Sequence, residues 1–477
     1  MISLNTRGVN SVNIKFGTDG WRAKIAQDFT FESLEKATLA LAITLEEENV
    51  SKKDCVIGYD TRFFSKDFAR HSAEVLSGVG FDVTISENFV PTPTLAFSVK
   101  DMNCAVGIMI TASHNPYEYN GFKIKQSFGG SASGDFTSKV ESNLSKINNY
   151  KFSNEKKKIS VKNLFENYRN SLLKFVDLDL IKGSDLRVAV DCMNGAGSGY
   201  LAKLLFDLNI DVFPVRNERD PYFKGSRPEP IPQLLGPLSY EVFSKSLNLG
   251  TALDGDGDRV ASCDSNGTVF TSQQTYALLL NHLVTNKKMN GKVLKNFAVS
   301  VLIDKLSKLY DIEFEVLPIG FKYICSKMIS DGNVLMGGEE SGGFGFLGHI
   351  PDRDGFLSSL YLIESVAVTK KSLMDQLDEI YDKVGFFEYD RYDLKLETSV
   401  DEVRRKIKDL IDNPKKTIND KKVLKISTID GIKYILEDES WLLIRPSGTE
   451  PLVRIYAEGT SIHEAKALTR FGRSLFH

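Results

Sequence analysis

Hydrophobic and polar positions change their spacing regularly along the first part of the chain. Apolar runs at 54–60 (DCVIGYD), 81–87 (FDVTISE) and 104–110 (CAVGIMI) have the length and composition of buried strands. Between such runs the apolar residues recur at helical spacing, as in residues 31–48, which follow Thr30 as a helix cap. Strands that alternate with helices predict βαβ units around a largely parallel sheet.

The same alternation returns twice before the pattern changes. Residues 186–215 read as strand, glycine-rich turn, helix and strand, and a third unit begins near Thr268. From about Asp382 short strands surround one amphipathic helix at 400–411, which predicts a smaller C-terminal α+β domain. The predicted fold class is therefore α/β, with mixed but largely parallel sheets and a distinct last domain.

Composition narrows the class of partner. The 477 residues are 42% hydrophobic and 26% charged, with a net charge of −3, which is typical of a globular protein and lacks the basic footprint of a nucleic-acid binder. The five cysteines are scattered without a C-x-x-C pair, which favours reduced thiols in the cytoplasm. No signal-peptide pattern and no apolar run of about 20 residues is present, so we expect no membrane association.

A polar stretch, TASHNPYEYNGFKIK (111–125), directly follows the apolar run at 104–110. It lies where a strand releases the chain onto the carboxyl edge of a sheet, which is where open α/β sheets bind ligands. Pro116 keeps Asn115 out of the α region, so we expect Ser113 on a bent, exposed segment with its hydroxyl outward. Taken alone, Ser113 is either a nucleophile or a turn serine. A Ser-His-Asp hydrolase is disfavoured, because no G-x-S-x-G elbow surrounds Ser113 and His114 is its immediate neighbour.

The sequence DGDGDR (254–259) places three carboxylates at alternate positions with only glycines between them. Glycine lets the backbone curl so that Asp254, Asp256 and Asp258 can point at one centre. Oxygen ligands of this kind suit Mg²⁺, which leaves room for phosphate oxygens. A solvated acidic turn is the alternative interpretation. A phosphatase of the DxDxT type is disfavoured because the threonine is missing.

Two further loops carry groups suited to a sugar phosphate. RPSGTEPLVR (445–454) brings two arginines, two hydroxyls and a glycine together, and such a loop can bind phosphate, although a simple turn with a satisfied arginine is also consistent with it. GEESGG (338–343) offers carboxylates and a hydroxyl to sugar hydroxyl groups; an ordinary acidic turn is the alternative. Lys322 and Arg353 are isolated cations that are equally consistent with solvated surface charges.

Taken together and in this order, FGTDGWR, TASHNP, DGDGDR, GEESGG and RPSGTEP resemble the motifs of the α-D-phosphohexomutase superfamily, which comprises phosphoglucomutases, phosphomannomutases and phosphoglucosamine mutases. The resemblance spans the whole chain. It implies three α/β domains and a C-terminal domain around a central cleft. With the pattern above, we place these domains at 1–150, 151–265, 266–381 and 382–477.

The resemblance also implies a role for individual residues. The residues for catalysis are Ser113 as a phosphoserine, Lys123 as the general base, His114 as a neighbour of the phosphate, and Arg22 and Arg259 as cations beside it. The residues for Mg²⁺ are Ser113, Asp254, Asp256 and Asp258. The residues for substrate binding are Lys322, Glu339, Ser341, Arg353, Arg445, Ser447, Gly448, Thr449 and Arg454.

The implied activity is an isomerase reaction of carbohydrate metabolism. Phosphoserine 113 donates to a hexose monophosphate, the 1,6-bisphosphate turns end for end, and its other phosphate returns to Ser113. GEES and HIPDRDG (349–355) resemble the corresponding motifs of phosphoglucomutases. This resemblance implies glucose 1-phosphate and glucose 6-phosphate as substrates, Mg²⁺ as cofactor and glucose 1,6-bisphosphate as activator. Some bacterial members have histidine where this chain has Gly343, which leaves the second acid/base group open.

Several alternatives remain open at this point. A phosphomannomutase or dual-specificity mutase fits the same motifs, and a phosphoglucosamine mutase fits them less closely. A sugar-phosphate-binding protein on the same fold is the non-enzymatic alternative, although binding alone requires no nucleophile at Ser113. Either a monomer or a homodimer is compatible with the sequence.

Overall fold

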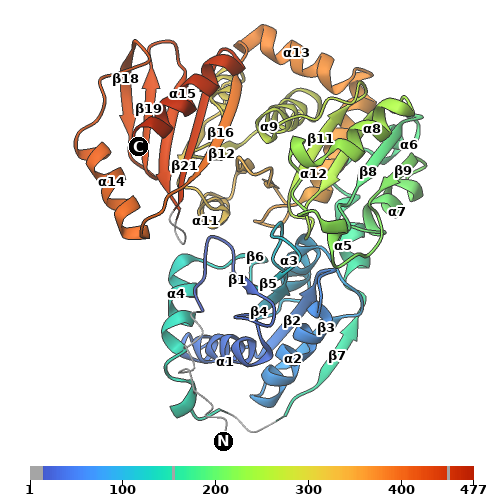
Figure 1. Ribbon diagram of the computed structural model, residues 1–477. Coiled ribbons are helices and arrows are strands. Elements are labelled where there is room, and N and C mark those ends of the chain that lie inside the picture. Colours follow the sequence, from blue (N-terminus) through green and yellow to red (C-terminus); the bar gives the residue numbers. More distant parts are fainter. Residues whose placement is uncertain (1–13, 153–155, 448–451, 477) are drawn as a thin grey trace, which may run out of the picture.

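The computed structural model describes residues 14–152, 156–447 and 452–476, and their strands form four sheets (Figure 1). Three sheets contain parallel pairs and are flanked by helices, and the fourth is entirely antiparallel. This arrangement confirms the predicted fold class. None of the described helices is long and apolar enough to cross a membrane.

The first sheet lies at the bottom of Figure 1 and has helices on both faces. In spatial order its strands are β1 (Trp21–Lys24), β5 (Tyr119–Gln126), β4 (Val106–Ile110), β2 (Asp54–Tyr59), β3 (Asp82–Ser86) and β7 (Ile159–Lys162), with the short β6 (Gly130–Ser131) beside β5. Its helices are α1 (Phe31–Glu47), α2 (Ser65–Gly78), α3 (Thr92–Asp101) and α4 (Gly134–Asn143). Strands β4, β2, β3 and β7 run parallel, and β5 runs antiparallel to its neighbours β1 and β4. The sequence predicts the first domain boundary at residue 150. Strand β7 follows this position and forms one edge of the first sheet.

The second and third sheets have four strands each. The second has the order β11 (Val260–Asp264), β10 (Leu249–Leu253), β8 (Arg187–Asp191) and β9 (Asp211–Val215), with helices α5 (Phe165–Leu172), α6 (Leu178–Lys182), α7 (Tyr200–Asp207) and α8 (Gly236–Ser244). The third has the order β13 (Phe314–Leu317), β12 (Lys292–Asn296), β14 (Val334–Gly338) and β15 (Phe344–Phe346), with helices α9 (Ser272–Asn281), α10 (Val301–Leu309), α11 (Phe321–Asp331), α12 (Gly355–Thr369) and α13 (Leu373–Val384).

One hydrophobic core runs through the second and third units. It includes Leu201 of α7, Leu279 of α9 and Phe356 of α12, each almost fully buried. Helix α12 is buried around nearly its whole circumference, which is typical of a helix packed between two layers. The two units are therefore joined by packing and not only by the chain.

The fourth sheet forms the upper left part of Figure 1. Its strands are β16 (Glu388–Lys395), β21 (Leu452–Gly459), β20 (Trp441–Pro446), β19 (Ile432–Leu436), β18 (Lys421–Ser427) and β17 (Thr417–Ile418), and its helices are α14 (Val400–Asp412) and α15 (Ile462–Ser474). A small apolar cluster that includes Phe297, Ile319 and Trp441 attaches this unit to the third.

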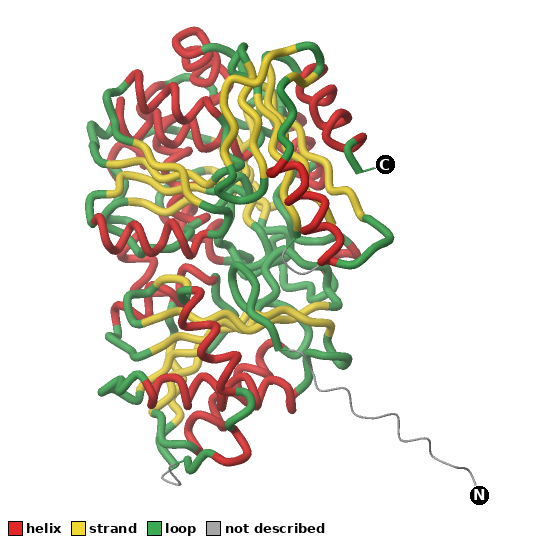
Figure 2. Tube along the Cα trace, turned by 90° about the vertical axis from the view of Figure 1, so that its left-hand side faces the viewer, coloured by secondary structure: helices red, strands yellow, loops and turns green. Residues whose placement is uncertain are grey.

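Loops gather between the first unit and the rest of the molecule (Figure 2), and three loops that follow strands carry candidate residues. Residues 111–118 follow β4, residues 254–259 connect β10 to β11, and residues 339–343 connect β14 to β15. These loops leave the carboxyl ends of strands, so the sheets of three units direct their functional edges toward one region.

Candidate active site

Ser113 lies at the centre of the region where the loops meet. Its hydroxyl Oγ donates to Asp254 Oδ2 at 2.8 Å and lies 3.3 Å from His114 Nδ1. Its backbone has φ of +52°, an uncommon conformation for a residue other than glycine. The expectation of an exposed hydroxyl was wrong: Ser113 is 1% exposed, because the loop at 254–258 packs directly against it.

The three aspartates of that loop form one group, as the sequence predicts. Asp254, Asp256 and Asp258 are fully buried, and each offers an oxygen within 4.8 Å of the others. Asp256 Oδ1 and Asp258 Oδ1 are buried and have no hydrogen-bond partner among the described residues. Burial and the charges of Asp256 and Asp258 raise the pKa of Asp254 well above its usual value. Buried carboxylates with unused oxygens fit a hard divalent cation such as Mg²⁺.

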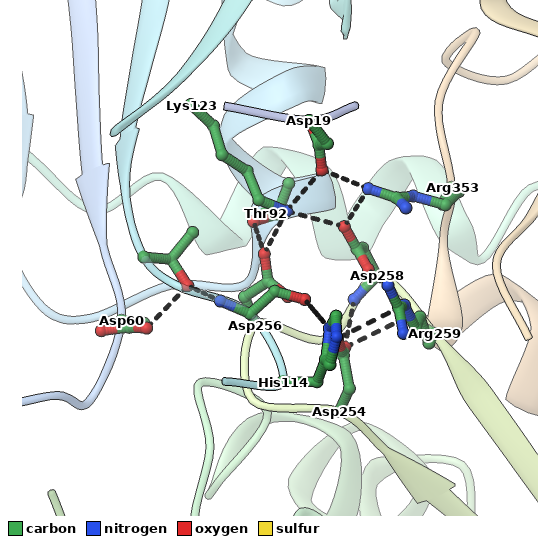
Figure 3. A network of polar contacts seen from close by, with 12 residues as sticks. Asp19, Asp60, Thr92, His114, Lys123, Asp254, Asp256, Asp258, Arg259 and Arg353 are labelled. Carbon is green, nitrogen blue, oxygen red and sulfur yellow. Dashed lines mark hydrogen bonds and ion pairs between the residues drawn. The ribbon is translucent and has the colours of Figure 1, made fainter. Parts of the chain in front are cut away.

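Lys123 and Arg353 supply positive charge to this acidic group (Figure 3). Lys123 Nζ lies 2.7 Å from Asp19, 2.8 Å from Asp256 and 3.0 Å from Asp258. Arg353 pairs with Asp19, and it contacts Asp258 at 2.7 Å and Glu339 at 3.3 Å. The carboxylates around Lys123 outweigh its burial and raise its pKa, so its amine is protonated in this arrangement.

Arg22, Arg259 and His114 surround the serine from other sides. Arg22 Nη1 donates to Asn115 Oδ1 at 2.8 Å, and Arg259 Nε lies 4.0 Å from oxygens of Asp254 and Asp258. Arg259 Nε is buried without a hydrogen-bond partner in the described part of the chain. Burial, followed by the charges of Arg259 and Arg22, lowers the pKa of His114 well below its usual value, so its ring is neutral. The two guanidinium groups suit a dianion on Ser113.

The structure brings two residues from the third unit close to this group and leaves two others apart. Glu339 reaches the acidic group through Arg353, and burial raises its pKa to about 7. Arg353 therefore contacts carboxylates here and not a free phosphate pocket. Lys322 lies at the start of α11, with its Nζ 5.4 Å from the centre of the Tyr323 ring, and Ser341 lies partly exposed in the turn after β14. Within the described residues neither forms a hydrogen bond with the three aspartates.

The predicted distal phosphate loop is only partly described. Arg445 and Arg454 lie directly opposite each other on β20 and β21, and Arg445 pairs with Asp430 at 3.2 Å. Arg454 Nε is buried without a hydrogen-bond partner among the described residues. The Ser447 amide donates to Leu452 O at 2.8 Å. Gly448 and Thr449 lie outside the described residues.

The sequence interpretation assigned no role to two groups that the structure places at the site. Asp19, in the loop before β1, is the shared partner of Lys123 and Arg353. Asp60 and Arg62 follow β2 and hold the Ser113 loop. The rule that selected Thr111, polar residues directly after a buried strand, applies equally to Asp60 and Arg62 and could have found them.

The similarity to known proteins extends over nearly the whole chain. Four family models, described as Phosphoglucomutase/phosphomannomutase alpha/beta/alpha domains I, II and III and C-terminal domain, match residues 13–151, 166–267, 271–384 and 366–470. The chain is 30% identical over 461 residues to a phosphoglucomutase/phosphomannomutase of Thermococcus kodakarensis, covering 96% of this chain and 98% of that one. It is 31% identical over 455 residues to a phosphoglucosamine mutase of Acetivibrio thermocellus, covering 93% and 94%. A solved structure of a putative phosphomannomutase from Thermus thermophilus aligns with a TM-score of 0.86 at 34% identity, covering 98% and 100%.

Proposed function

The chain belongs to the phosphoglucomutase/phosphomannomutase family of the α-D-phosphohexomutase superfamily, and from this premise we propose that it interconverts α-D-glucose 1-phosphate and glucose 6-phosphate through a phosphoserine at Ser113. It is thus an isomerase that moves a phosphoryl group within a hexose phosphate. The observation that carries the proposal is the position of Ser113 Oγ, 2.8 Å from Asp254 in a buried group of three aspartates and several cations. A binding protein would gain nothing from burying a nucleophile there.

The proposed reaction is a pair of phosphoryl transfers. A sugar hydroxyl oxygen attacks the phosphorus of phosphoserine 113, and the bond from phosphorus to Ser113 Oγ breaks. The proton of the sugar hydroxyl passes to a base, and the departing Oγ takes up a proton, which restores the serine hydroxyl. The 1,6-bisphosphate then turns, and Ser113 Oγ attacks its other phosphate by the same steps in reverse. Because phosphoryl transfer depends mainly on positioning and on neutralising charge, the buried cations are the main contribution of the protein.

The charge balance supports Mg²⁺ at the three aspartates. Phosphoserine brings about −1.5 to −2 charge next to three carboxylates. When bound, Mg²⁺ would neutralise phosphate oxygens at this position. Asp254, Asp256 and Asp258 would hold it, and the unused Oδ1 atoms of Asp256 and Asp258 are available ligands. Arg22 and Arg259 would hold the remaining phosphate oxygens.

We propose Lys123 as the base and as a cation, at different stages. In the arrangement described, its ammonium contacts Asp19, Asp256 and Asp258. A protonated lysine stabilises transferring phosphate but cannot accept a proton. Lys123 would therefore have to exchange these contacts for the sugar hydroxyl before it acts as a base.

The sugar preference rests on the loop after β14. Glu339 and Ser341 offer acceptors and a donor to the hydroxyl groups of the sugar ring. The phosphate that is not transferred is proposed to bind at the C-terminal loop, through Arg445, Ser447, Gly448, Thr449 and Arg454. Gly343 has no side chain, and the Arg353 side chain fills the space above it. GEES with HIPDRDG favours glucose phosphates, whereas relatives with phosphomannomutase and phosphoglucosamine mutase names make mannose and glucosamine the direct competitors.

A substrate panel tests this proposal. Glucose 1-phosphate, mannose 1-phosphate and glucosamine 1-phosphate are assayed in parallel with Mg²⁺ and catalytic amounts of the matching 1,6-bisphosphate. We expect the highest kcat/KM for glucose 1-phosphate. A higher kcat/KM for mannose 1-phosphate or glucosamine 1-phosphate would overturn the sugar assignment, and absence of turnover for all three would overturn the mutase assignment.

A further inference from the structure

Arg62 is a fully buried arginine that contacts the Ser113 loop, residues 111–118. It follows β2, in the turn that leads into α2, and its side chain is 0% exposed. Its guanidinium donates to the carbonyl oxygens of Pro116 at 2.7 Å, Tyr119 at 3.0 Å, Ser113 at 2.7 Å and Asn115 at 2.6 Å. With the bond from Nε to Asp60 at 3.0 Å, all five N–H donors of the guanidinium are used.

The carboxylate of Asp60 connects this guanidinium to the amide of Ser113. Asp60 Oδ2 accepts from both Arg62 Nε and the hydroxyl of Thr111, the latter at 2.6 Å. Thr111 Oγ1 in turn accepts from the Ser113 amide at 2.9 Å. Ser113 is therefore held at its N–H through Thr111 and at its C=O by Arg62. These two bonds fix the backbone of a residue whose φ of +52° is otherwise unfavourable.

A loop from the second unit covers the other side of Arg62. The Phe223 ring, 2% exposed, lies 4.9 Å from the guanidinium carbon. The same loop continues to Pro228, whose carbonyl accepts from the Gly255 amide at 3.1 Å, inside the acidic loop. A Cβ at Gly255 would lie 2.3 Å from Ser113 O, so the two loops are in tight contact at the carbonyl that Arg62 binds. Arg62 thus lies at the junction of the serine loop and the aspartate loop.

We propose that Arg62 is a positioning residue for the phosphoryl transfer, acting through the backbone of Ser113 to hold Oγ against the aspartate group. This inference rests on the proposed function and adds to it a residue that contacts neither phosphate nor cation. A lysine at this position has three donors for five acceptors and lacks the planar fork, so it leaves buried carbonyls of the loop without partners. The loop then relaxes, and the serine oxygen moves away from Asp254.

The test compares Arg62→Lys with the parent chain in the Mg²⁺-loaded enzyme. A displacement of about 1 Å at reacting atoms costs about 100-fold in rate, so we expect kcat for glucose 1-phosphate to fall by about 100-fold. KM should stay within about threefold, because the sugar contacts lie on other loops. Adding guanidinium ions to Arg62→Ala should restore part of the lost rate, an effect that a purely structural role would not produce.

Arg187 provides a control outside the site, at an exposed position. It also pairs with an aspartate, at 3.4 Å, donates to the carbonyls of Lys245 and Ser246, and lies 5.0 Å from the ring of Phe213, but it contacts no residue of the site. Arg187→Lys should leave kcat unchanged. If Arg62→Lys does not fold, Thr111→Val, which breaks the connection from Asp60 to the Ser113 amide, should lower kcat in the same way.

Two outcomes overturn the inference and leave the proposed function intact. Folded Arg62→Lys or Thr111→Val with kcat within about threefold of the parent would show that the hydrogen bonds of Arg62 and Thr111 do not position Ser113. A loss of rate that guanidinium ions do not relieve, accompanied by an equal loss in Arg187→Lys, would indicate general destabilisation. A parent chain that never carries phosphate on Ser113 and converts no hexose phosphate would instead overturn the proposed function, and this inference with it.

Discussion

Gly343→Ala is expected to displace Arg353 from the acidic group. A Cβ at Gly343 would lie 2.2 Å from Arg353 Cδ and 2.8 Å from Cγ, whereas ordinary contacts begin at 3.4 Å. Arg353 must therefore retreat by roughly 1.2 Å, the difference between the contact limit and the present distance. A retreat of that size lengthens the contact of 2.7 Å with Asp258 and that of 3.3 Å with Glu339 beyond hydrogen-bond range.

The size of the effect follows from those two contacts. A hydrogen bond to a charged group contributes about 1.5–3 kcal/mol, so losing both, with some compensation by the displaced side chain, should cost about 3 kcal/mol in unfolding free energy. The assay is urea unfolding of the magnesium-free protein, followed by kcat of the Mg²⁺-loaded enzyme, which should fall at least about tenfold.

Gly78→Ala is the control for this substitution. Gly78 ends α2, and a Cβ there would meet nothing within 4 Å. The change should raise the unfolding free energy by up to about 1 kcal/mol and leave kcat unaffected. If Gly343→Ala has the stability and the kcat of the parent, the position of Arg353 does not depend on the space above Gly343.

Three other expectations can be checked independently. Burial and then the charge of Lys295 lower the pKa of Lys433 from 10.5 to about 7. Between these pH values the unfolded chain holds one more proton than the folded chain, so the unfolding free energy should rise with pH by up to about 1.4 kcal/mol per pH unit. A Lys433→Met variant that keeps this slope would contradict the assignment. Asp256→Asn should weaken Mg²⁺ binding at least about tenfold in calorimetry, because it removes a buried ligand charge, and unchanged affinity would place the cation elsewhere. Phe356→Ala should cost about 3–5 kcal/mol and destabilise the second and third units together, since both use this core; hydrogen exchange that rises in only one unit would argue against a shared core.

The sequence was sufficient to predict features that depend on neighbouring residues. The apolar run at 104–110, followed by Thr111 and Ser113, predicts a strand that ends at a functional edge of the sheet. In the structure this run contains β4, and Ser113 lies in the loop that follows it. The alternation of aspartate and glycine in 254–258 predicts three converging carboxylates, which the buried group confirms. Both patterns act over a few residues, where backbone geometry alone decides the outcome.

Contacts between distant segments could not be predicted in this way. Asp19 is 104 positions from Lys123 and 334 from Arg353, and nothing in its own loop indicates these partners. The burial of Ser113 depends on the loop at 254–258, which lies 141 residues later. Arg62 has the local signal of a polar residue after a strand, but its role depends on four carbonyl oxygens that only the folded loop brings together.

The most direct test of the central claim is the transfer of phosphate from Ser113 in a single turnover. The phosphorylated chain is mixed rapidly with glucose 1-phosphate, and the intact mass of the protein and the amount of glucose 1,6-bisphosphate are followed together, with Ser113→Ala as the control. We predict that the protein loses one phosphoryl group from Ser113 for each bisphosphate formed, at a rate no lower than kcat, and that Ser113→Ala is inactive. Conversion by Ser113→Ala, or phosphate carried on another residue, would contradict the account.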